Sequence, residues 1–216
     1  MTEAAVTVDE LVVADPVEAW ESAGFTVEPG GVCQVGSVRI RLIGAREHRG
    51  IVGWSLRHMP DDIHDLDGVP TTRSTSALTE VEATPPRHAN GVISIDHVVL
   101  LSPDLSRTTE ALAAIGLHPR REREGELGGA PVRQVFYRFG DVILEVVGSP
   151  VAASDGPSSL WGITFTVADI DATAVSLGEA TSRIKDAVQP GRRITTLRHR
   201  DLGMSVRTAL ISPDVR

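Results

Sequence analysis

The sequence predicts an α+β protein built from paired βαβββ units, whose curved, cup-like mixed sheets carry their helices on the outer face. Three observations predict this class. A pattern of strand, turn and helix recurs along the 216 residues. Further strand patterns follow the helices. Finally, 20 Gly and 13 Pro residues, with only 4% aromatic residues, favour many short elements joined by tight turns.

The most regular copy of the pattern lies in the middle of the chain. IDHVVLLSPDL predicts a strand that ends in a turn, and SRTTEALAAIGL predicts a helix closed by Gly116. The helix interpretation rests on the three- and four-residue spacing of Leu105, Thr109, Leu112 and Ile115. RQVFYRFGD and VILEVVG then predict two strands of the same unit.

Two more copies and a shortened one flank this unit. At the start of the chain, DELVVADPVEAWESAGFTVEP parallels the strand and helix, and VGSVRIRLIG parallels FGDVILEVVG. After Pro157, WGITFTVADIDATAVSLGE repeats the strand and helix, and RRITTLRHRD and MSVRTALIS supply strands. GIVGWSLRHMPDDIHDL resembles the start of a further unit that is not completed.

The repeats predict three regions. Residues 1–64 form a degenerate N-terminal unit with a partial second unit, and residues 92–216 form a complete pair. Residues 65–91 are a Ser/Thr/Pro-rich linker, for which a disordered connector and a partly ordered strand pair both stay open. Because two units side by side form a curved sheet around a shared concavity, a ligand is expected there.

Charge and cysteine content narrow the partners and the compartment. The 21 basic and 29 acidic residues give a net charge of -8, which argues against nucleic acid or an anionic membrane as a partner. The single cysteine, Cys33, excludes an internal disulfide and a thiolate zinc site. Neither a secretion signal nor an apolar run of about 18 to 20 residues is present, so a cytoplasmic protein is expected.

The repeats, the IDHVVL opening and the FGDVILEVVG closing strand resemble the vicinal oxygen chelate superfamily of glyoxalase I, extradiol dioxygenases and bleomycin-resistance proteins. They are most similar to its glyoxalase-like domain proteins. The resemblance is good over residues 92–213 and degenerate over residues 5–90. It implies a homodimer, and a divalent metal held by a His in the first strand and a Glu or His in the last strand of two paired units.

Carried onto this sequence, the resemblance gives His97 and Glu145 as metal ligands in the middle unit. The corresponding positions of the last unit are Gly162 and Thr208, and neither is a strong ligand. A tightly held divalent metal in an open site needs at least three donors, so a metal cofactor is possible with only two candidate ligands found. His97 and Glu145 are therefore also interpreted as a catalytic acid/base pair, or as a polar pair that satisfies itself by a hydrogen bond.

In the N-terminal half, the corresponding positions are Glu10, Arg41 and Gly53. An arginine at such a position would repel a metal ion. This half is therefore expected to be free of metal.

A second candidate feature is AVQPGRRITTLRHRD. We predict that Arg192, Arg193 and Arg198 include ligand-binding residues, because guanidinium groups pair well with a carboxylate or a phosphate. Strand alternation places Arg192 and Arg198 on one face and Arg193 on the other. The alternative is an edge strand protected by charge. Trp161 is expected to contact ligand at the mouth of the cavity.

Three functions follow from these residues. The first is a glyoxalase-like protein that binds a small organic anion and is not a four-ligand glyoxalase I. The second is a metal-dependent lyase, isomerase or dioxygenase in which a loop residue such as His199 joins His97 and Glu145. The third is a non-catalytic, ligand-sequestering protein of the bleomycin-resistance type, whose ligand binding would survive His97→Gln. Whether the protein is an enzyme stays open.

Overall fold

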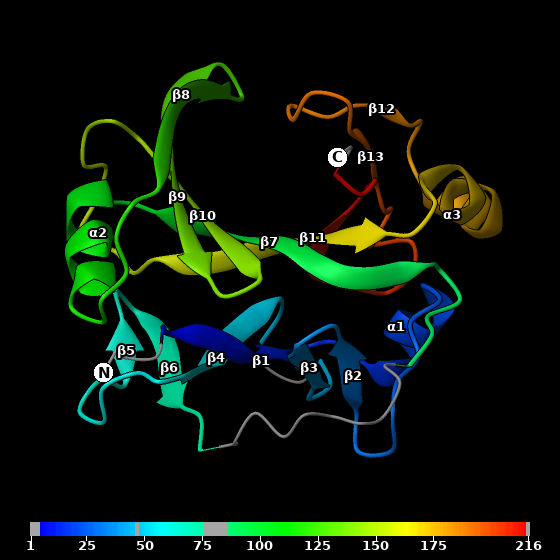
Figure 1. The fold of residues 1–216 in the computed structure, drawn as a ribbon, viewed down its shortest axis with the longest axis horizontal. Coiled ribbons are helices and arrows are strands. Elements are labelled where there is room, and N and C mark those ends of the chain that lie inside the picture. The colour runs from blue at the N-terminus through cyan, green and yellow to red at the C-terminus, as the bar shows by residue number, and fades with distance from the viewer. Residues whose placement is uncertain (1–4, 46–47, 76–85, 215–216) are drawn as a thin grey trace.

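The computed structural model describes residues 5–45, 48–75 and 86–214 (Figure 1). The described elements, in chain order, are β1 (Thr7–Val13), α1 (Val17–Ser22), β2 (Val32–Val35), β3 (Val38–Leu42), β4 (Ile51–Arg57), β5 (Asp65–Leu66), β6 (Val69–Arg73), β7 (Val92–Ser102), α2 (Leu105–Ala113), β8 (Arg121–Leu127), β9 (Ala130–Phe139), β10 (Val142–Gly148), β11 (Ser159–Val167), α3 (Ile170–Leu177), a 3₁₀ turn (Gly178–Ala180), β12 (Lys185–Asp186), β13 (Arg193–Thr196) and β14 (Arg207–Ile211).

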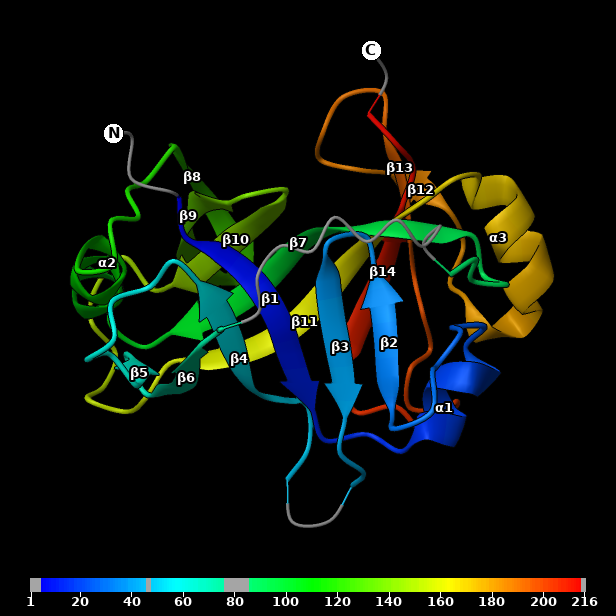
Figure 2. The same ribbon diagram turned by 60° about the horizontal axis from the view of Figure 1, so that its bottom comes forward.

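The strands form two sheets, and the predicted fold class is confirmed. The N-terminal sheet has six strands in the order β2-β3-β1-β4-β6-β5 (Figure 2), and the C-terminal sheet has eight in the order β12-β13-β14-β11-β7-β10-β9-β8. The C-terminal sheet joins two βαβββ units, one from β7 to β10 and one from β11 to β14, through the antiparallel pair β7–β11. This sheet curves so that β8 and β12 rise at its two ends above β7 and β11 (Figure 1).

Both longer helices begin at an aspartate that follows a long strand. The Asp104 carboxylate accepts hydrogen bonds from the backbone N–H groups of Ser106 and Arg107 at the start of α2. Asp169 does the same for Asp171 and Ala172 at the start of α3. These N-caps satisfy N–H groups that have no partner inside a helix, so each strand-to-helix turn is specified locally.

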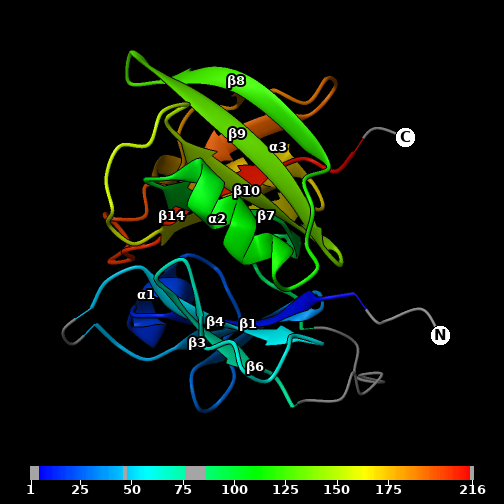
Figure 3. The same ribbon diagram turned by 90° about the vertical axis from the view of Figure 1, so that its left-hand side faces the viewer.

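The core lies between the two sheets, which stack face to face (Figure 3). Trp54 of the N-terminal sheet contacts Phe139 of the C-terminal sheet, with ring centroids 5.6 Å apart. Phe25 contacts Phe165 across the same interface at 5.1 Å. Because the C-terminal sheet packs its convex face on this core, its concave face is free to carry polar residues.

The predicted linker contains a strand pair at its beginning. Residues 65–73 form the hairpin of β5 and β6, which extends the N-terminal sheet. Its turn is Asp67–Gly68, in which both residues have positive φ, 54° and 88°. Asp-Gly is the sequence preferred for such a two-residue turn. Of the two alternatives for this part of the linker, the strand pair is therefore correct, and residues 76–85 lie outside the described residues.

Within the described part of the chain, no helix is both long enough and apolar enough to cross a membrane.

Candidate functional site

His97 and Glu145 lie beside each other on the concave face of the C-terminal sheet. His97 is in the middle of β7 and Glu145 is in β10, its parallel neighbour. His97 Nε2 is 3.6 Å from Glu145 Oε2, and each side chain is 14% exposed. The structure therefore brings together the two residues that the sequence pairs, and it leaves both partly open to solvent.

The Asp96 carboxylate contacts the ring nitrogen of His97 that faces away from Glu145. Asp96 occupies a β-bulge in β7, because the register with β11 passes from Ile95 directly to His97. A bulge turns a side chain that would otherwise alternate to the opposite face. Asp96 Oδ2 lies 2.7 Å from His97 Nδ1. The imidazole is thus held at one nitrogen while the other is directed toward Glu145.

Asp96 is itself held by a buried arginine. Arg192 Nη1 lies 2.7 Å from Asp96 Oδ1, and the two side chains are 6% and 9% exposed. Burial alone would raise the pKa of Asp96, but the hydrogen bonds and charges of His97 and Arg192 outweigh it and hold the pKa below its ordinary value. Asp96 is therefore a carboxylate at neutral pH.

Glu145 is held by a residue of β9, the strand on the side of β10 away from β7. Gln134 in β9 donates to Glu145 Oε1 at 2.6 Å, and Arg123 Nε in β8 donates to Gln134 Oε1 at 2.7 Å. Polar groups thus follow one another from β8 to the segment before β13. We call this set the polar row: Arg123, Gln134, Glu145, His97, Asp96 and Arg192.

The polar row lies next to further positive charge that our sequence analysis missed. In β8, Arg121 is paired with Phe136, which is in turn paired with Glu145, so these three residues share the concave face. Arg123 lies on this face as well, whereas Glu124 points to the opposite face and pairs with Arg133 at 2.8 Å. The alternation of Arg and Glu in REREGEL is the signal that could have identified this arginine face.

Trp161 lies in a bulge at the start of β11 and is 38% exposed. The guanidinium of Arg207 in β14 stacks over its ring, 4.8 Å from the centroid. Arg207 is paired with Gly162, and Gly162 is paired with Val99, two residues beyond His97. Trp161 and Arg207 therefore lie beside the concave face at the end of β7 nearer Ser102, and Arg207 is another residue that sequence reasoning did not find.

The three arginines predicted to bind ligand do not gather at one place. Arg192 is buried in the polar row and committed to Asp96. Arg193 forms a two-pronged ion pair with Asp171 of α3, at 2.9 and 2.5 Å, on the outer face. Arg198 is exposed beyond the opposite end of β13, about 20 Å from Arg192 at strand spacing. A ligand at the polar row cannot use all three.

The donors around His97 and Glu145 do not fit a tightly bound divalent metal. By strand register, the last-unit counterparts of the pair are Gly162 and Ala209, since His97 pairs with Ile143 and Gly162 with Arg207. The predicted position Thr208 lies on the other face, where it is buried and donates to Val206 O at 3.1 Å. Neither glycine nor alanine carries a side-chain donor.

His199 does not complete the set. It lies in the turn after β13, where burial, together with the charges of Arg207 and Arg200, lowers its pKa. Among the residues that the structure describes, no three His, Cys, Asp or Glu side chains are grouped so that they could hold a metal ion. The residues present therefore offer two donors where at least three are needed.

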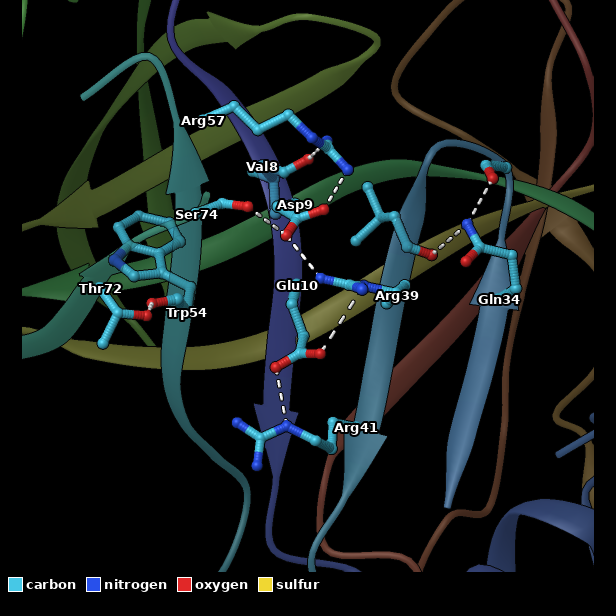
Figure 4. A network of polar contacts seen from close by, with 12 residues as sticks. Val8, Asp9, Glu10, Gln34, Arg39, Arg41, Trp54, Arg57, Thr72 and Ser74 are labelled. Atoms are coloured by element: carbon cyan, nitrogen blue, oxygen red, sulfur yellow. Dashed lines mark hydrogen bonds and ion pairs between the residues drawn. The ribbon is translucent and has the colours of Figure 1, made fainter. Parts of the chain in front are cut away.

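The N-terminal sheet repeats this geometry with other residues (Figure 4). Asp9 occupies a bulge in β1 as Asp96 does in β7, and Arg57 bonds to it. The counterparts of His97 and Glu145 are Glu10 and Arg41, which form an ion pair at 2.7 Å. An arginine cation thus occupies a position that the resemblance assigns to a metal ligand.

Solved structures with the same fold span nearly the whole chain. 4-Hydroxymandelate synthase from Streptomyces coelicolor matches with a TM-score of 0.65 and 16% identity, over 98% of this chain and 93% of that one. BphC, a halotolerant catechol dioxygenase, matches with a TM-score of 0.63 and 14% identity, over 99% and 89%. A fusion protein of a xylose isomerase-like TIM barrel and 4-hydroxyphenylpyruvate dioxygenase matches with a TM-score of 0.61 and 12% identity, over 99% of this chain and 49% of that one.

No protein-family model matches the sequence, and no curated protein matches it. At these low identities, the likeness to the solved structures shows a shared fold and leaves the activity to be argued from the site.

Proposed function

This chain has the vicinal oxygen chelate fold, and we propose that the concave face of its C-terminal sheet binds a small organic anion at the polar row. The observation that carries the proposal is the combination of His97 and Glu145 with the arginine face of β8. Arg121 and Arg123 supply positive charge on this face, although the whole chain has a net charge of -8. A concave surface with a charge opposite to that of the rest of the molecule favours a ligand of complementary charge.

The two ends of the polar row suit different parts of such a ligand. The guanidinium groups of Arg121 and Arg123 can pair with a carboxylate, since their planar donors match its two oxygens. His97 and Glu145 can donate to and accept from a hydroxyl or carbonyl group of the same molecule. They are also groups able to move a proton on the concave face. Val99 and Ile143 surround them with apolar surface for a carbon skeleton.

This function differs from that of a four-ligand glyoxalase I. Because Gly162 and Ala209 replace two of the four donor positions, the concave face offers one His/Glu pair in place of four donors. Isomerisation of the methylglyoxal–glutathione adduct by the pure protein would contradict the proposal.

The test is isothermal titration calorimetry with two phenolic probes, one anionic and one neutral. One is 4-hydroxymandelate, an anion taken from the name of one structural neighbour. The other is catechol, a neutral phenol taken from the name of another. The proposal predicts saturable binding of 4-hydroxymandelate, weakened by added salt because the interaction is ionic, and much weaker binding of catechol. Equal affinity for both compounds would contradict an anion site.

Arg123→Gln and Arg133→Gln form a matched pair of variants on the same hairpin. Arg123 lies on the concave face, whereas Arg133 pairs with Glu124 on the other face. Losing a charge-assisted contact costs about 1.5 to 3 kcal/mol, so Arg123→Gln is expected to weaken 4-hydroxymandelate binding about tenfold or more. Arg133→Gln is expected to leave it unchanged. The same affinity in both variants would remove β8 from the site.

A further inference from the structure

Arg192 is more deeply buried than is expected of an arginine that contacts a ligand. Its side chain is 6% exposed, and Nε donates to the backbone carbonyl of Ser212 at 2.8 Å. Nη1 faces Asp96 at 2.7 Å and Asp214 at 3.3 Å. The Ser212 carbonyl fixes the direction of the guanidinium, so that one edge is directed at the Asp96 carboxylate.

The state of Asp96 determines how His97 carries its proton. Because Asp96 forms a buried ion pair with Arg192, both oxygens of its carboxylate are acceptors, and His97 Nδ1 at 2.7 Å must be the donor. In a neutral imidazole the other nitrogen then has no proton. His97 Nε2 therefore presents its lone pair to the concave face beside Glu145. If Asp96 were free to turn away, the opposite tautomer would place its N–H there instead.

We infer that Arg192 is a positioning residue, which acts through Asp96 to fix His97 with its proton on Nδ1 and with Nε2 facing the ligand. The inference rests on the proposed function, in which His97 is the polar end of the binding site. The sequence predicts that Arg192 contacts the ligand. By this inference Arg192 instead supports His97 through Asp96, and the ligand does not touch it. The same contact gives the segment before β13, in one unit, a role in positioning the histidine of the other unit.

The N-terminal sheet supplies an internal comparison. Arg57 is buried and bonds to Asp9 at the equivalent bulge, but the next residue is Glu10 in place of a histidine. Removing Arg57 breaks a buried Arg–Asp contact of the same kind without touching His97. Arg57→Gln therefore separates a general loss of stability from a specific effect on the imidazole.

The test is long-range ¹H–¹⁵N correlation NMR of the histidine rings, which shows directly which ring nitrogen carries the proton. The spectra are recorded at about pH 8.5, above the ordinary histidine pKa of about 6.5, and His97 is assigned with His97→Gln. The wild type is expected to show His97 as the Nδ1–H tautomer. Arg192→Gln is expected to shift it to a mixture with substantial Nε2–H, whereas Arg192→Lys, which retains the charge, restores Nδ1–H at least in part. Arg57→Gln is expected to leave the His97 signals in place.

A folded Arg192→Gln protein whose His97 keeps the wild-type tautomer would overturn the inference, as would an Nε2–H tautomer in the wild type. If Arg192→Gln does not fold, Arg192→Met, which keeps the aliphatic part of the side chain, takes its place in the same comparison. The measurement contains no ligand, so it separates the two proposals. A shifted tautomer in Arg192→Gln, with no binding of 4-hydroxymandelate to the wild type, would support the role of Arg192 and contradict the proposed function. An unchanged tautomer, with binding of 4-hydroxymandelate to the wild type, would support the proposed function and contradict the role of Arg192.

Discussion

Gly162 shows how one residue shapes the site. A Cβ atom at this position would lie 2.8 Å from the backbone carbonyl oxygen of Arg207 and 3.3 Å from its Cβ. The N-terminal sheet repeats the arrangement, since a Cβ at Gly53 would lie 2.9 Å from the carbonyl oxygen of Pro70. At both glycines the neighbouring strand thus lies too close for a side chain to fit without a shift of the backbone. The missing metal donor in the last unit is therefore part of the sheet packing.

Gly162→Ala is expected to destabilise the protein by about 1 to 3 kcal/mol, because the added methyl group must push a backbone carbonyl away. Unfolding by urea, followed by circular dichroism, measures the change. Gly125→Ala is the control: it lies in β8, and its new Cβ would meet only side-chain atoms at ordinary contact distance, Gln134 Oε1 at 3.5 Å and Val132 Cγ2 at 3.8 Å. That variant is expected to be as stable as the wild type or slightly more stable. Equal stability of Gly162→Ala and the wild type would contradict the close approach.

Some site residues could be predicted from sequence, and others could not. His97 and Glu145 were found because strand alternation and the family resemblance both point to them. Strand alternation also placed Arg192 and Arg193 on opposite faces, but it does not show which residues each of them contacts. The contact between Arg192 and Asp96 joins residues far apart in sequence, and Asp96 reaches the site only through a bulge, which shifts the alternation by one residue.

At the scale of elements, the hairpin of β5 and β6 joins the two sheets. The Asp67 carboxylate at its turn accepts hydrogen bonds from Arg107 and Thr108 of α2 and, at 2.6 Å, from Ser158. Burial alone would raise the pKa of Asp67, but these three donors outweigh it and hold the pKa below its ordinary value. The Asp-Gly turn can be read from sequence. Its docking on α2 cannot, because it depends on the placement of both sheets.

Asp67→Asn is expected to lower the free energy of unfolding by about 2 kcal/mol at neutral pH, since hydrogen bonds to a charged group are lost. Asn-Gly suits the same turn, so the backbone is kept. Because the folded-state pKa lies below the unfolded value of about 3.9, the carboxylate contributes fully above about pH 4 and less as pH falls through the folded-state pKa. Urea unfolding at several pH values should therefore show the difference from wild type shrinking below about pH 4.

The exposed Asp141 supplies the control for this pH dependence. Asp141→Asn is expected to unfold like the wild type at every pH. A difference between Asp67→Asn and the wild type that stays constant from pH 7 to about pH 3 would contradict the role given to the Asp67 charge.

At the scale of the whole molecule, the two sheets share one core. Besides the aromatic contacts of the core, the buried Asp15 carboxylate accepts from Trp20 Nε1 at 3.1 Å and from the backbone N–H of Ser205 at 2.8 Å. The N-terminal half thus contributes the apolar and polar surface on which the C-terminal sheet is packed.

We therefore expect both halves to unfold together. Trp20 and Trp54 report on the N-terminal half, and Trp161 on the C-terminal half. Heating should give coincident transitions by tryptophan fluorescence and by far-ultraviolet circular dichroism. Two separate transitions would show that the interface is weaker than the contacts of Trp54 and Asp15 indicate.

The central claim is that a small organic anion binds at the polar row, and a crystal structure of the protein with 4-hydroxymandelate tests it most directly. The account predicts the carboxylate within about 3 Å of the Arg121 or Arg123 guanidinium, at ordinary hydrogen-bond distance, and the ligand against His97 and Glu145. A ligand found on the N-terminal sheet at Arg39 and Arg41, or a concave face that stays empty at saturating ligand concentration, would contradict it.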